Sequence, residues 1–179
     1  HKRERRRNIT SVHMASTSVS GPSPSTPRLH AILPERWREV GHTKLSRVDG
    51  ACVVYWMLRD FRAANNWALL QAQNMATQTR LPLRVCVTLP MQKEDQSERM
   101  RAFQVEGLRE VERDLRGLGI PVHLVSYDGT ADETASRVVE FCRAHQAACV
   151  VCDFHPLRLP RAAVTAVAAA LDAESPAVP

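Results

Sequence analysis

Four short apolar runs, each followed by a segment of helical periodicity, restrict the fold of this chain more than any other feature. The runs cover residues 51–57, 83–89, 120–126 and 147–152 and are rich in valine, leucine and cysteine. They do not alternate strictly between apolar and polar residues, so both faces of each strand are expected to be buried. Strands of this kind belong to parallel sheets that helices cover on both sides. The sequence therefore predicts a doubly wound α/β fold.

The segments between these runs carry apolar residues at helical spacing, and several begin with a residue that can cap a helix. Asn65 is placed to cap a helix that continues to about residue 78, and Pro160 suits the first turn of the last helix. Residues 95–98 and 130–133 have the pattern of a capping pair. The apolar stripes predicted behind these two pairs are Met100, Phe103, Leu108, Val111, Leu115 and Leu118, and Ala135, Val138, Val139 and Cys142.

The connections between the strands restrict their order in the sheet. Right-handed crossovers leave few arrangements, and the usual one winds outward from the first strand and then returns past it. The expected strand order is 3-2-1-4. Such a sheet normally gains a fifth strand after the fourth helix, so we expect residues 50–179 to form a truncated, Rossmann-like domain. The edge beside the fourth strand is then a hazard for unwanted strand pairing.

Residues 1–49 differ in composition from the rest of the chain and are predicted to form a disordered, Ser/Pro-rich tail. Residues 1–50 contain 10 Lys and Arg against 4 Asp and Glu, whereas residues 51–179 contain 14 against 15, so the domain itself gives no electrostatic argument for DNA binding. The basic start, HKRERRR, is compatible with a nuclear signal, an organellar transit peptide or a solvated tail without a specific role. We therefore expect an intracellular location, nuclear or organellar. Residues 33–40 are the part of the tail expected to pack a helical turn against the domain.

Membrane and cysteine chemistry are not indicated by the sequence. No apolar run approaches the roughly 18 residues that a membrane-spanning helix needs, so no membrane partner is expected. The five cysteines are an odd number and most of them lie in apolar runs, which is typical of reduced core residues in an intracellular protein. Cys149 and Cys152 have CxxC spacing, but residues three apart on a strand face opposite sides, which argues against a redox or metal pair. No metal is expected.

Charged residues follow the first and the fourth strand, the two strands that flank the predicted reversal of strand order. In a doubly wound sheet, the crevice lies beyond the carboxyl ends of these two strands. Two interpretations stay open: the crevice binds a ligand, or Arg59 pairs with Asp153 across the sheet end while Asp60 caps the next helix. The candidate crevice residues are Arg59, Asp60, Asp153, Phe154 and His155.

The motifs of several common enzyme classes are missing from the sequence. The turn after the first strand has no glycine, so it lacks the G-x-G-x-x-G pattern that brings a pyrophosphate to the backbone. The chain also contains no Walker lysine motif, no His-x-x-x-His pair on a helix and no G-x-S-x-G elbow. His123 and His145 are expected to be strand or surface residues, and only His155 lies at the crevice. We find no set of residues that would run a reaction by itself.

Three stretches of the sequence resemble class II cyclobutane-pyrimidine-dimer photolyases: VVYWMLRDFRAANNWALLQAQ (53–73), FQVEGLREVERDLRGLGIPVHLV (103–125) and VVCDFHPLR (150–158). The resemblance covers about residues 50–171 and is that of the N-terminal α/β domain. Two positions depart from the family pattern, Asn65, where Asp is usual, and His155, where Ser is usual. The matching positions are Tyr55, Trp56, Met57, Arg59, Asp60, Arg62, Asn66 and Trp67, followed by Asp153, Phe154, Pro156, Leu157 and Arg158.

The resemblance implies a light-driven DNA repair enzyme, a deoxyribodipyrimidine photo-lyase. In that family, excited reduced FAD passes an electron to a cyclobutane dimer flipped out of damaged DNA. FAD and DNA are held by a C-terminal helical domain, which is absent from these residues, so no catalytic residue is expected here. The N-terminal domain of many relatives holds an antenna chromophore, a deazaflavin or a folate, and the candidate crevice named above is the expected site.

Three functional hypotheses follow. The leading one is a photolyase fragment that supplies the antenna and structural domain and is inactive alone. The second is a stand-alone, non-catalytic α/β module that binds a small ligand or a partner. The third, a nucleotide-binding stress-type protein of the same fold, is the weakest because the glycine-rich phosphate loop is missing.

Overall fold

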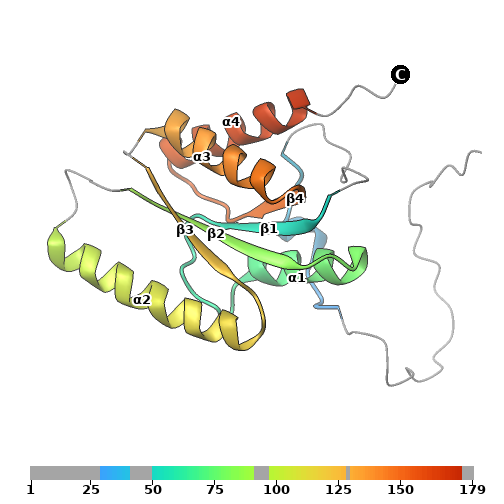
Figure 1. The fold of residues 1–179 in the computed structure, drawn as a ribbon, viewed down its shortest axis with the longest axis horizontal. Helices are drawn as coiled ribbons and strands as arrows, with labels where there is room; N and C mark the ends of the chain where they lie inside the picture. The colour runs from blue at the N-terminus through green and yellow to red at the C-terminus, as the bar shows by residue number, and fades with distance from the viewer. Residues whose placement is uncertain (1–28, 41–49, 91–96, 128–129, 175–179) are drawn as a thin grey trace, which may run out of the picture.

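A computed structural model describes residues 29–40, 50–90, 97–127 and 130–174 of the chain and shows strands alternating with helices (Figure 1). The elements are η1 (Pro34–Arg36), β1 (Cys52–Met57), α1 (Trp67–Thr79), β2 (Leu83–Pro90), α2 (Glu98–Gly117), β3 (Val122–Tyr127), α3 (Ala131–Ala144), β4 (Ala147–Cys152) and α4 (Arg158–Glu174). The four strands form one parallel sheet in the order β3-β2-β1-β4. The predicted fold class and strand order are therefore confirmed.

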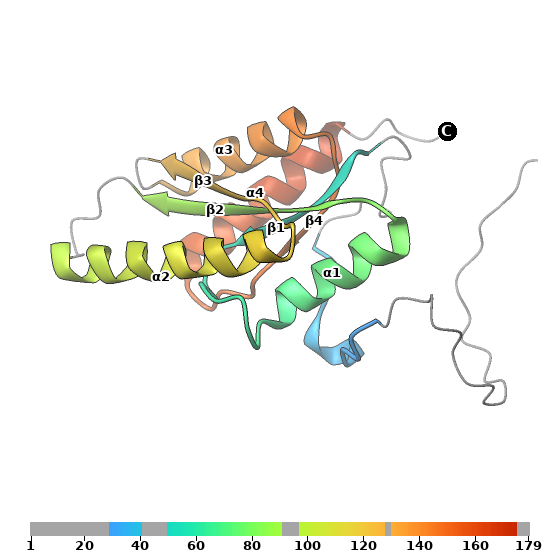
Figure 2. The same ribbon diagram turned by 60° about the horizontal axis from the view of Figure 1, so that its bottom comes forward.

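Helices cover both faces of this sheet, as Figures 1 and 2 show. On one face, apolar side chains of α1 and α2 join those of the strands in a single buried cluster. On the other face, α3 and α4 do the same and also pack against each other. Because each helix buries one apolar stripe against the sheet, the domain has three layers and two apolar cores.

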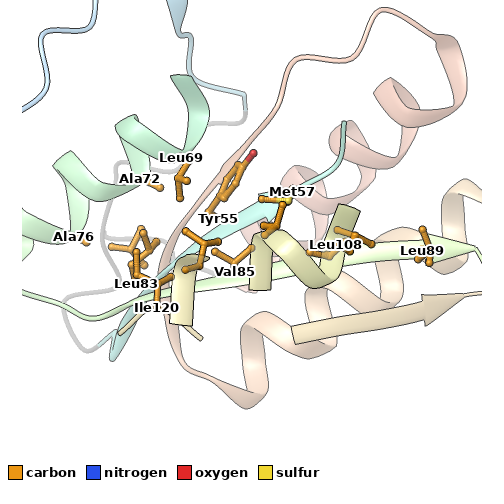
Figure 3. Close-up of a cluster of buried hydrophobic side chains, with 14 residues drawn as sticks. Tyr55, Met57, Leu69, Ala72, Ala76, Leu83, Val85, Leu89, Leu108 and Ile120 are labelled. Carbon is orange, nitrogen blue, oxygen red and sulfur yellow. The ribbon is translucent and has the colours of Figure 1, made fainter. Parts of the chain in front are cut away.

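β1 lies at the centre of the sheet, and its side chains contribute alternately to the two cores. Val53, Tyr55 and Met57 belong to the cluster under α1 and α2, which Figure 3 shows around Tyr55 and Met57. The alternate residues of β1 face α3 and α4. All six residues of the strand are at most 1% exposed. Burial of a large apolar side chain stabilises a fold by roughly 1.5–3 kcal/mol, so β1 is the main organising strand.

Side-chain caps start three of the helices, and one of them corrects a prediction. Asn66, not Asn65, caps α1, since its Oδ1 accepts a hydrogen bond from the backbone N–H of Leu69 at 2.9 Å. Asn65 instead has a left-handed backbone with φ 53°, which asparagine tolerates better than most residues. Thr130 caps α3 as predicted, with its hydroxyl 3.2 Å from the N–H of Glu133.

The start of α2 differs from the prediction. Ser97 caps this helix through the N–H of Met100 at 3.3 Å, whereas position 95 of the predicted pair lies outside the described residues. The predicted stripe is buried only in the second half of the helix, at Leu108, Val111 and Leu115.

The first half of the predicted stripe is wrong for a geometric reason. Met100 is 59% exposed and Phe103 is 80% exposed. Figures 1 and 2 show the first turns of α2 extending beyond the end of β2. Phe103 also lies roughly 140° around the helix from Leu108, at about 100° per residue, so it is not on the side of α2 that faces the sheet. Leu118, predicted at the far end of the stripe, is 67% exposed because it follows the last helical residue.

The edge strand β4 is less buried than β1. Every residue of β4 is only partly buried, since β4 lies at one edge of the four-stranded sheet. Residues 29–40, which belong to the predicted tail, lie beside α1 on its side away from the sheet (Figure 2). Residues 1–28 and 41–49 are outside the described part of the chain, so the prediction of disorder there stays a prediction.

Three aromatic rings form a cluster at the amino end of β3 and the carboxyl end of α3. The ring of His123 lies 5.2 Å from that of Phe141 and 5.1 Å from that of His145, measured between centroids. The Nε2 atom of His123 is buried and has no hydrogen-bond partner within the described residues. Burial, followed by the nearby charges of His145 and Arg84, lowers the pKa of His123 below its ordinary value of 6.5.

This lowered pKa predicts a loss of stability in mild acid. The unfolded chain takes up a proton on this imidazole below about pH 6.5, whereas the folded domain resists it, so the free energy of unfolding falls as the pH falls through that window. Urea unfolding at pH 7.5 and 5.5 measures the effect. H123F should reduce the difference between the two pH values, and the exposed-site control H30A should not. An equal difference in both variants would contradict the assignment.

Candidate functional site

The carboxylate of Asp153 joins the carboxyl ends of β1 and β4. Asp153 directly follows β4 and is only 4% exposed. Its Oδ2 atom accepts hydrogen bonds from three successive backbone N–H groups at 3.0, 2.9 and 3.0 Å, those of Leu58, Arg59 and Asp60. Its Oδ1 atom accepts one from the hydroxyl of Tyr55 at 2.6 Å. Four internal donors therefore bind this nearly buried carboxylate, three of them at one oxygen atom.

Asn66 is the second centre of the same network. Its Nδ2 group donates to the hydroxyl oxygen of Tyr55 at 2.8 Å and to the backbone carbonyls of Asp60 and Arg62 at 3.0 and 3.1 Å. Asn66 is 1% exposed, and its other side-chain atom caps α1. The loop between β1 and α1 is therefore held at its start by Asp153 and at its end by Asn66.

The hydroxyl of Tyr55 connects the two centres, because it donates to Asp153 and accepts from Asn66. In Figure 3 it points out of the surrounding apolar cluster. Burial, followed by the charge of Asp153, raises the pKa of Tyr55. The phenol stays protonated at neutral pH and serves as a hydrogen-bond bridge, which is the usual fate of a buried tyrosine hydroxyl.

The structure brings together the two strand exits that the sequence predicted to meet. Asp153 contacts Arg59 through the backbone N–H of Arg59, not through an ion pair with its guanidinium. The predicted helix cap at Asp60 is wrong, because Asn66 occupies that position. The carboxylate of Asp60 instead lies 3.5 Å from the guanidinium of Arg62 at the surface.

The other predicted crevice residues lie at the rim of the same sheet end. Phe154 is 67% exposed, and the side chain of Arg59 is also exposed. The Nδ1 atom of His155 accepts a hydrogen bond from the backbone N–H of Leu157 at 3.2 Å, just before α4. Asp153 is thus buried behind this rim, whereas Arg59 and Phe154 are exposed on it.

Two hollows that the structure describes lie away from this rim. One runs between β3 and α3 and includes Leu124 and Phe141, and the other runs along α2 and includes Arg101 and Val105. Each has a volume of about 370 Å³ and is open to solvent. Neither includes a residue of the predicted crevice, so antenna binding at Arg59, Asp60, Asp153, Phe154 and His155 stays a prediction.

Two members of the network, Tyr55 and Asn66, were identified in the sequence only through the family resemblance. A physical signal was nevertheless present. A tyrosine within a strand that is otherwise buried and apolar needs a hydrogen-bond partner for its hydroxyl, and the two adjacent asparagines after the strand were the nearest amide candidates.

The CxxC pair has no joint role in the structure. Cys149 packs against the cluster on the α1 and α2 side, and Cys152 against the cluster on the α3 and α4 side, which confirms that they face opposite ways. Burial raises the pKa of each thiol to about 11, so both stay protonated at neutral pH. In the described ranges, no three His, Cys, Asp or Glu side chains are grouped as metal ligands. None of the described helices is long and apolar enough to cross a membrane.

The network predicts a large cost for D153N. The remaining amide oxygen can still accept from the three backbone N–H groups, but the NH2 group then faces the hydroxyl of Tyr55, which loses its acceptor. The negative charge that strengthens all four hydrogen bonds is also lost, so the variant should lose about 3 kcal/mol of unfolding free energy. The control D60N changes an exposed carboxylate and should stay within about 0.5 kcal/mol of the parent. Urea unfolding measures both, and similar stabilities for the two variants would contradict the network's structural role.

Comparisons with known proteins agree with this geometry. The family model described as DNA photolyase matches residues 53–178. Deoxyribodipyrimidine photo-lyase of Arabidopsis thaliana is 39% identical over 106 residues, which is 59% of this chain and 20% of the relative. The enzyme of the same name from Oryza sativa subsp. japonica is 39% identical over 131 residues, covering 72% of this chain and 25% of the relative.

A third relative, the deoxyribodipyrimidine photo-lyase of Potorous tridactylus, is 38% identical over 104 residues, covering 58% of this chain and 19% of the relative. The chain thus spans about a fifth to a quarter of the length of the curated relatives that it matches. The family match includes β1, β4 and both halves of the Asp153 network. This chain belongs to the DNA photolyase family.

Proposed function

We propose that this chain provides the N-terminal α/β domain of a class II photolyase, an enzyme that repairs cyclobutane pyrimidine dimers in light. Family membership and the order of the three resembling stretches support this proposal. The observation that carries it is the Asp153 network, because it explains physically why the matching residues stand at the ends of β1 and β4.

The catalytic chemistry of the proposed enzyme lies outside this domain. Reduced FAD supplies the electron that splits the dimer, and both FAD and damaged DNA are proposed to bind the helical part of the longer enzyme. The described residues contain neither a glycine-rich phosphate loop nor a charge surplus that would favour them as the DNA site. The contribution proposed for this chain is structural support and, where present, an antenna.

An antenna chromophore, a deazaflavin or a folate, would absorb light and pass the excitation energy to the flavin. The exposed rim beside Asp153 fits a chromophore in part: the guanidinium of Arg59 can donate to ring carbonyls, and Phe154 offers an exposed aromatic face. Asp153 fits poorly as a ligand group, since it is 4% exposed and already accepts four internal hydrogen bonds. Its role is to hold the rim in place.

The same rim favours a second candidate function, a non-catalytic module that binds a small aromatic ligand. Phe154, Leu157 and Leu159, which follow Asp153 in the chain, are each more than 60% exposed, so an apolar surface is available without any flavin domain. The absorption spectrum of the purified chain addresses both candidates. A bound chromophore absorbing between the near ultraviolet and the blue supports the antenna, and R59A with F154A should then release it.

A chimera tests the proposed domain function directly. Residues 50–174 of this chain would replace the matching part of the Oryza sativa photolyase, and light-dependent survival of an ultraviolet-treated, photolyase-deficient bacterium would be measured. The chimera should restore survival in blue light and not in the dark, whereas this chain alone should not restore it. Flavin absorbance of the purified chimera verifies that it folded.

The matched control carries D153N within the chimera and should lose part of the rescue through instability. A folded, flavin-bound chimera that gives no light-dependent survival would contradict the proposed function. Rescue by this chain alone would refute the assignment of catalysis to another part of the enzyme.

A nuclear or organellar location is proposed from the basic segment HKRERRR, and a fluorescent fusion of the whole chain tests it.

A further inference from the structure

The outer side of α1 carries a polar side chain that is bonded to a distant part of the chain. Asn74, in the middle of α1, is only 7% exposed. Its Oδ1 atom accepts a hydrogen bond from the backbone N–H of His30 at 2.7 Å, and its Nδ2 group donates to the backbone carbonyl of the same residue at 2.9 Å. The side-chain amide of Asn74 therefore forms hydrogen bonds with both the N–H and the C=O group of His30.

A second contact lies at the start of α1, about two helical turns from Asn74. The guanidinium carbon of Arg36 stands over the ring of Trp67, 4.7 Å from its centroid. Cation–π contacts of this length stabilise an exposed pair. The segment thus runs from the middle of α1 at His30 toward its first residue, antiparallel to the helix, and Figure 2 shows it beside α1 away from the sheet.

The contact between Asn74 and His30 does not depend on the side chain of His30. Asn74 recognises only backbone atoms of His30, whose side chain is exposed. Arg36 adds a side-chain contact, with the ring of Trp67. A backbone N–H and C=O of one residue, followed six residues later by an arginine, are therefore the groups that this side of α1 contacts.

We propose that the outer side of α1 is a binding site for a polypeptide segment with a short non-helical stretch followed by a 3-10 turn, and that residues 29–36, which include η1, occupy it in cis. This segment is here called the strap. The proposal is independent of antenna or repair function. Without the strap, the amide of Asn74 would face solvent beside an apolar helix, which explains why a polar residue is buried on the outside of α1.

The strap also contacts the residue next to the Asp153 network. Trp67, under Arg36, is the first residue of α1 and follows Asn66 directly. Asn66 holds Tyr55 and the carbonyls of the loop that connects β1 with α1. A docked strap therefore supports the end of α1 that fixes the candidate rim.

Hydrogen exchange on the whole chain tests the proposal with a matched pair of variants. H30P removes the backbone N–H that donates to Asn74, whereas H30A keeps it and changes only an exposed side chain. Amides of residues 29–37 should exchange about tenfold faster in H30P than in the parent, because the loss of a clasping hydrogen bond releases the strap. H30A should exchange like the parent.

Helix-side variants give an independent readout. N74A removes both hydrogen bonds and should accelerate exchange in residues 29–37, whereas Q78A, an exposed position on the same helix, should not. Because N74A can also destabilise α1, the exchange of the α1 amides is measured in the same experiment. If these amides also exchange faster, the comparison of H30P with H30A, a position outside the helix, tests the proposal. Equal exchange of residues 29–37 in H30P and H30A would overturn the proposal.

Discussion

One buried carboxylate holds together the end of the sheet that carries the candidate site. Asp153 collects three backbone N–H groups from the exit of β1 and the hydroxyl of Tyr55 from within it. Parallel strands place their carboxyl ends at one edge of a sheet, but nothing in the strand ladder fixes the loops that follow. A charged acceptor with four donors supplies that constraint, because hydrogen bonds to a charged group are stronger than those between neutral groups.

This network gives a structural meaning to the sequence stretches that resemble photolyases. Within them, Tyr55, Asn66 and Asp153 are buried and joined by hydrogen bonds, so they brace the ends of β1 and β4. Arg59 and Phe154 are the exposed members at the same edge. The motif therefore combines an internal brace with a surface rim.

The sheet was predictable from the sequence because strands buried on both faces leave continuous apolar runs, and right-handed crossovers then determine their order. The capping residue of α1 was not, since Asn65 and Asn66 are equivalent in a pattern and differ only in backbone conformation, φ 53° against −108°. Phe103 is apolar, yet it lies five residues before Leu108 and therefore roughly 140° around the helix from the buried stripe, so its apolar character alone did not predict burial.

The contacts that sequence patterns miss are those between a side chain and a distant backbone. Asn74 and His30 are 44 residues apart, and a bond to backbone atoms imposes no residue type on its partner. The same holds for the N–H groups that Asp153 receives. Such contacts leave no periodic signal, although they position both the candidate rim and the strap.

The central claim is that Asp153 and Tyr55 form one buried unit, and a double-mutant cycle measures it most directly. The free energies of unfolding of Y55F, D153N and the double variant would be compared with that of the parent. The account predicts a coupling energy of about 1 kcal/mol or more, because each single change already breaks the shared hydrogen bond. Losses that simply add, with a coupling energy near zero, would contradict it.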